Sequence, residues 1–71
     1  MNNSDMHAVG DDVAAQCRSR NYTAAHAVIE GFNGQLRYML LARTALDLLK
    51  GTQRDRAALM HLLKEITDDA N

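Results

Sequence analysis

Apolar residues recur at intervals of three and four from Tyr22 to Leu40, which is the spacing of one face of an α-helix. At about 100° per residue they share one sector of about 120°, so the segment predicts a helix with one well-defined buried face. The positions are Tyr22, Ala25, Val28, Ile29, Phe32, Leu36, Met39 and Leu40. Such a face needs an apolar surface to cover it, and this requirement limits how the rest of the chain can fold.

The composition of the whole chain also favours helices. The sequence has no proline, which would interrupt a helix, and it is rich in alanine and leucine. Aromatic residues, which favour strands, make up only 4%. A chain of 71 residues is the size of one small domain. We therefore expect a single all-α domain over residues 1–71.

A short N-terminal helix is expected to begin after Ser4, whose hydroxyl can accept a hydrogen bond from the first turn. Its apolar residues follow at helical spacing, and they are Met6, Val9, Val13 and Cys17. This apolar stripe is thin, so the helix supplies little surface to its neighbours.

A long central helix is expected from about Asn21 or Thr23 to Lys50. Gly31, Asn33 and Gly34 would allow a break, but the apolar face continues through them. We therefore expect one continuous helix whose two halves are covered by different partners.

The C-terminal helix has the clearest start signal. Thr52 to Asp55 resembles a capping box, which predicts a helix from near Gln53, and Gly51 is expected to end the preceding helix in the left-handed conformation. A connector this short predicts an αα-hairpin with the central helix. In that hairpin one apolar stripe meets another: Leu41, Ala45, Leu48 and Leu49 against Leu59, Leu62, Leu63 and Ile66.

The first half of the central helix then has only the thin N-terminal helix to cover it. Exposed apolar patches of this size mark interfaces, so we expect a dimeric helical bundle. The residues predicted to form the dimer or partner interface are Tyr22, Val28, Ile29, Phe32, Leu36, Met39 and Leu40.

Few residues suggest chemistry. The histidines and Cys17 lack the paired spacings of a zinc site, and Cys17 is expected to be a buried apolar residue rather than a nucleophile. We therefore expect no metal, no cofactor and no catalytic residues, and we do not expect an enzyme. A lone cysteine also fits a reducing compartment, so we expect the protein to be cytoplasmic. The sequence has no apolar run long enough to span a membrane.

These features favour a small protein–protein interaction module, which regulates a partner protein by binding it as an inhibitor, anti-activator, adaptor or co-chaperone does. The alternative is a small dimeric DNA-binding regulator, in which Arg54 and Arg56 contact phosphates; the same two residues would suit an acidic protein partner. The net charge of −1 and pI near 6.2 favour the first interpretation, because the broad basic surface of a nucleic-acid binder is missing.

Overall fold

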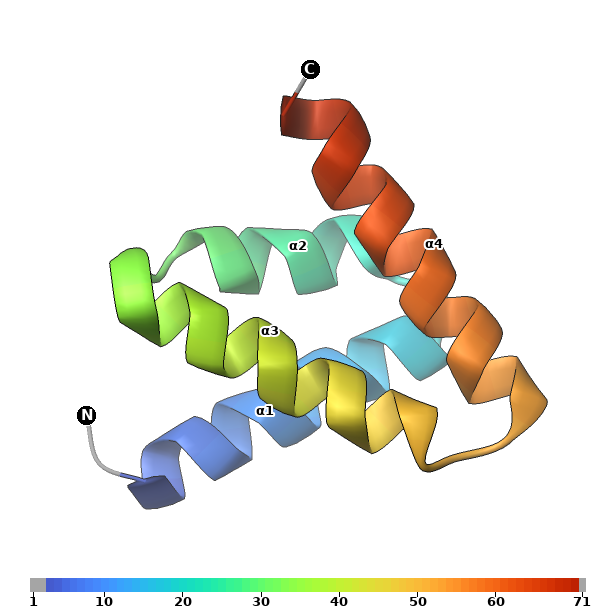
Figure 1. Ribbon diagram of the computed structural model, residues 1–71, viewed down its shortest axis with the longest axis horizontal. Coiled ribbons are helices and arrows are strands. Elements are labelled where there is room, and N and C mark those ends of the chain that lie inside the picture. Colours follow the sequence, from blue (N-terminus) through green and yellow to red (C-terminus); the bar gives the residue numbers. More distant parts are fainter. Residues whose placement is uncertain (1–2, 71) are drawn as a thin grey trace.

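Four α-helices form the part of the chain that the computed structural model describes, residues 3–70, with side chains described for residues 5–68. They are α1 (Asn3–Arg18), α2 (Tyr22–Glu30), α3 (Gly34–Leu49) and α4 (Gln53–Ala70). The all-α prediction is confirmed. Every pair of these helices is in contact. In Figure 1, α2 and α3 run in nearly opposite directions, and α4 rises steeply from the end of α3 past the start of α2.

The core lies where the four helices meet, and each helix contributes to it. Its largest fully buried side chains are Val13, Cys17, Ile29, Leu40, Thr44, Leu48 and Leu62. The stripe predicted for the first helix is in this core, with Met6, Val13 and Cys17 buried and Val9 packed against them. The cap predicted at Ser4 concerns a side chain outside the described residues.

The prediction of one continuous helix from Asn21 to Lys50 was wrong, because the chain breaks between Glu30 and Gly34. Asn33 is extended, with ψ of 150°, and Gly34 has a φ of 54°, a value that favours glycine. These two residues redirect the chain so that α3 returns past α2. Periodicity did not reveal the break, because the helical spacing of apolar residues continues across it.

Side chains from both helices hold the break together. The Arg37 Nε donates to the carbonyl of Phe32 over 2.9 Å, which satisfies a backbone acceptor in the break itself. The same guanidinium lies 3.4 Å from Glu30, and the other Glu30 oxygen is 3.0 Å from Nε2 of the buried His26. Arg37 therefore links the start of α3 to the end of α2.

The turn between α1 and α2 is a Schellman motif. The N–H of Asn21 donates to the carbonyl of Gln16 and that of Arg20 donates to Cys17, over 2.8 and 3.0 Å. Arg20 has a φ of 64° at the position where glycine is usual. Neither predicted cap of α2 acts as one: Asn21 makes no side-chain cap, and the Thr23 hydroxyl donates to Glu65 in α4 over 2.9 Å.

The start of α4 at Gln53 is confirmed, and so is its capping box. The N–H of Asp55 donates to the Thr52 hydroxyl over 3.2 Å, and the N–H of Thr52 donates to the Asp55 carboxylate over 3.3 Å. The left-handed conformation predicted for Gly51 was wrong, since Gly34 is the only described glycine with a positive φ. A residue with a side chain does not fit at position 51, because its Cβ would lie 1.9 Å from Oδ2 of Asp55.

The hairpin of α3 and α4 is not confirmed. In Figure 1, α4 turns back from the end of α3 and diverges from it toward the C-terminus. The stripes expected to meet are only partly buried: Leu48, Leu59 and Leu62 lie in the core, but Leu49 and Leu63 are exposed.

Thr44 provides a test of the core. Its side chain is fully buried and its hydroxyl has no hydrogen-bond partner. Thr44→Val should therefore stabilise the fold by about 1 kcal/mol, because it removes an unsatisfied polar atom without leaving a cavity. Urea unfolding measures the change, and Thr44→Ser, which keeps the hydroxyl and loses the methyl, should destabilise. A less stable Thr44→Val protein would show that the hydroxyl is satisfied.

Candidate functional site

The most distinctive surface of the molecule is the outward side of α3. Large apolar side chains are exposed along it, with Tyr38 78% and Leu46 58% exposed. We define the outer face of α3 as Tyr38, Met39, Ala42, Leu46 and Leu49, all of which are exposed.

The opposite side of α3 carries Leu40, Thr44 and Leu48 at four-residue intervals, and all three are fully buried. The helix is therefore largely apolar on both its buried and its exposed side. Helices that are apolar all round are normally buried on all sides. The outer face of α3 is thus a surface with the character of a core and with no cover from the described residues.

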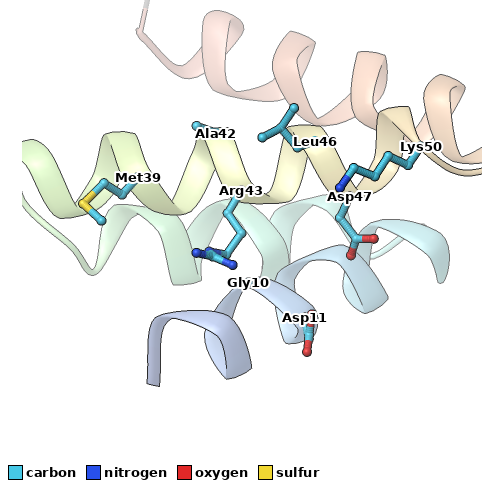
Figure 2. Close-up of a pocket in the computed structure, with 8 residues that line it drawn as sticks. All are labelled: Gly10, Asp11, Met39, Ala42, Arg43, Leu46, Asp47 and Lys50. Atoms are coloured by element: carbon cyan, nitrogen blue, oxygen red, sulfur yellow. The ribbon is translucent and has the colours of Figure 1, made fainter. Parts of the chain in front are cut away.

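A hollow of about 460 Å³ lies along this face, between α3 and α1 (Figure 2). Met39, Ala42 and Leu46 line it from α3, and Gly10 and Asp11 line it from α1. Gly10 lets the two helices approach closely, since a Cβ there would lie 3.0 Å from Cδ of Arg43. The hollow extends the outer face toward α1.

Charged side chains border the apolar surface. Arg43 and Lys50 line the hollow, and Arg43 Nη1 contacts the ring of His7, 3.0 Å from Nε2. Asp47 also lines it and is paired with Arg18 over 3.3 Å. The border is therefore polar while the outer face itself carries no charge, which is the anatomy of a protein interface.

The structure divides the residues predicted to form the interface. Ile29 and Leu40 are buried in the chain's own core, so in this fold they are not available to a partner. Tyr22, Val28 and Phe32 pack against that core, and the Tyr22 ring stacks on His61 with centroids 5.1 Å apart. Leu36 and Met39 are exposed, at 41% and 45%.

Sequence reasoning did not assign Tyr38, Ala42, Leu46 or Leu49 to a surface for partners. One signal was present, because Leu49 belongs to the apolar stripe formed by Leu41, Ala45, Leu48 and Leu49. That stripe was predicted to pair with the C-terminal helix, but Leu49 is 51% exposed.

Arg54 and Arg56 lie away from the outer face of α3. Arg56 donates to the carbonyl of Gly51 over 2.9 Å, so it is engaged in closing the α3–α4 connection. Arg54 lines a second hollow, of about 670 Å³, together with Arg18 and Arg20 from α1 and the turn that follows it. The structure does not bring the two predicted phosphate contacts together on one open surface.

The prediction that Cys17 is buried is confirmed, with no exposed area. Burial raises the pKa of its thiol to about 11, and the charge of Arg18 offsets only part of this. The thiol is therefore protonated near neutral pH and is a poor nucleophile. Among the side chains described, no three histidines, cysteines or carboxylates gather as a metal site would require.

Comparison of the chain with protein-family models, with curated proteins and with solved structures finds no match. Within residues 3–70, none of the helices combines the length and the apolar character needed to cross a membrane.

Proposed function

We propose that this chain is a small protein–protein interaction module that regulates a partner protein by binding it. The observation that carries the proposal is the outer face of α3, where four large apolar side chains are exposed on a helix whose other side is core. Surfaces of this kind are uncommon on proteins that act alone, and they usually mark interfaces.

A second copy of this chain is the proposed occupant of the face when no partner is present. Met39, Ala42, Leu46 and Leu49 are separated by three, four and three residues, the spacing of the seam between two packed helices. Two copies of α3 in antiparallel orientation place the large Leu46 of each opposite the small Ala42 of the other. The face is thus complementary to itself, as a two-fold interface must be.

An amphipathic helix of the regulated protein meets the same requirements, since helix-in-groove recognition needs an apolar stripe with a polar border. Partner binding and self-association therefore compete for the outer face of α3. This competition provides the regulation, because the free chain is held as a dimer until the partner displaces one copy.

Light scattering should give a mass near twice 7.9 kDa for the free protein at micromolar concentration. Leu46→Asp should shift the mass to that of one chain, because it places a charge at the centre of the seam. Met60→Asp is the matched control, since Met60 is similarly exposed but lies on α4. A wild-type monomer at all concentrations, or equal effects of the two substitutions, would contradict dimerisation through α3.

Affinity capture from the native lysate tests the regulatory role. The wild-type chain and Met60→Asp should retain the same protein, Leu46→Asp should lose it, and nuclease treatment should change nothing. Capture that nuclease abolishes would favour the alternative function, a DNA-binding regulator that uses Arg54. The Arg56 bond to Gly51 weighs against that function, because it ties one end of the Arg56 guanidinium to the chain's own backbone.

A further inference from the structure

The second hollow, between the α1–α2 turn and the first turns of α4, has an unusual concentration of charge. Arg18, Arg20 and Arg54 line it together with a single carboxylate, that of Asp55. The whole chain has a net charge of −1, whereas the residues that line this hollow carry an excess of two positive charges.

The carboxylate is already engaged. Asp55 lies 3.4 Å from Nε of Arg18 and also accepts the N–H of Thr52 in the capping box. Arg18 is shared between Asp55 and Asp47. The guanidinium groups of Arg20 and Arg54, in contrast, form no ion pair or hydrogen bond with any described residue. Two guanidinium groups therefore remain available in one hollow.

The backbone at Arg20 points to the same conclusion independently. Its φ of 64° lies in the left-handed region, where a side chain is strained and glycine is favoured. The Schellman turn around it would form more readily with glycine. An arginine at this position costs stability, and in return it adds a charge to the hollow.

The remaining walls suit an organic group. Tyr22 and His61 line the hollow as a stacked ring pair, and Ala57 and Ala58 add to the apolar part. The volume of about 670 Å³ is in the range of small-molecule sites and is much larger than a bare oxyanion needs.

We propose that this hollow binds a small phosphate monoester, whose phosphate is held by Arg20 and Arg54 and whose organic part packs against Tyr22 and His61. A phosphate monoester carries a charge between about −1.5 and −2 at neutral pH, which matches the two available guanidinium groups. Arginine is suited to this ligand because its planar fork donates two hydrogen bonds to one oxyanion. The site is separate from the outer face of α3.

Calorimetric titration at pH 7.5 with phenyl phosphate and with inorganic phosphate tests the proposal. Phenyl phosphate should bind saturably and about tenfold more tightly than inorganic phosphate, because only the former reaches the ring pair. Equal affinities would overturn the monoester in favour of a bare anion, and the absence of saturable binding by either would overturn the site. Tighter, salt-steep binding of a duplex oligonucleotide would replace it with contact to a DNA backbone.

Three variants test the assigned residues. Arg54→Gln should weaken phenyl phosphate binding by about tenfold or more. Arg20→Gly should weaken it similarly while raising the melting temperature, so the loss cannot come from unfolding. Lys50→Gln removes the same charge outside the hollow and should leave the affinity unchanged. Equal weakening by Lys50→Gln, or an Arg20→Gly protein that keeps its affinity, would overturn the assignment.

Discussion

Leu62→Ala should lower the free energy of unfolding by about 2–5 kcal/mol, which is a large share of the stability of a domain this small. Leu62 is fully buried, at the level where α4 meets the other helices, so truncation leaves a cavity that neighbours from several helices must fill. Urea unfolding followed by circular dichroism measures the loss.

The neighbouring residue is the matched control. Leu63 is 36% exposed and faces outward from α4, so Leu63→Ala should cost less than about 1 kcal/mol. The two substitutions are chemically identical and lie one position apart, and they differ only in burial. Similar losses of stability for both variants would mean that α4 is rotated about its own axis relative to this structure, so that both leucines are buried.

Gly51→Ala should destabilise the protein by about 1–3 kcal/mol. The added methyl would lie 1.9 Å from Asp55 Oδ2 and 3.0 Å from Asp55 Cβ, so the carboxylate must move. Moving it breaks the capping box with Thr52 and the ion pair with Arg18. Thermal unfolding gives the change in stability.

A double-mutant cycle with Asp55→Ala shows whether this mechanism is correct. Asp55→Ala alone loses the cap, at about 1 kcal/mol. In that background Gly51→Ala should cost much less than in the wild type, because the carboxylate that it displaces is gone. Additive losses would indicate that Gly51 is required for backbone conformation, although its φ is not in the left-handed region.

Several local features were predictable because their causes lie within a few residues of each other. The capping box is an interaction between Thr52 and Asp55, and the structure contains both of its hydrogen bonds. The core stripe of α1 follows from helical spacing alone, and the buried state of Cys17 follows from the same spacing.

The candidate surface was harder to predict because it depends on which apolar face each helix turns inward. Met39 and Leu40 are adjacent in the same helix, yet one is 45% exposed and the other is fully buried. In the stripe from Tyr22 to Leu40, Ile29 and Leu40 are buried by the chain itself, while Leu36 and Met39 are exposed. Met39 is therefore part of the outer face of α3.

The sequence by itself determined the all-α class, the thin core stripe of α1 and the capped start of α4, because periodicity and capping act between residues at most four positions apart. Tertiary structure alone decided that the central segment breaks at Asn33 and Gly34, that Leu49 and Leu63 stay exposed, and that Arg20 and Arg54 line one hollow. Apolar periodicity is the same in a continuous helix and in two helices that fold back on each other. The choice between them is made by the area that all four helices bury together, which no local pattern records.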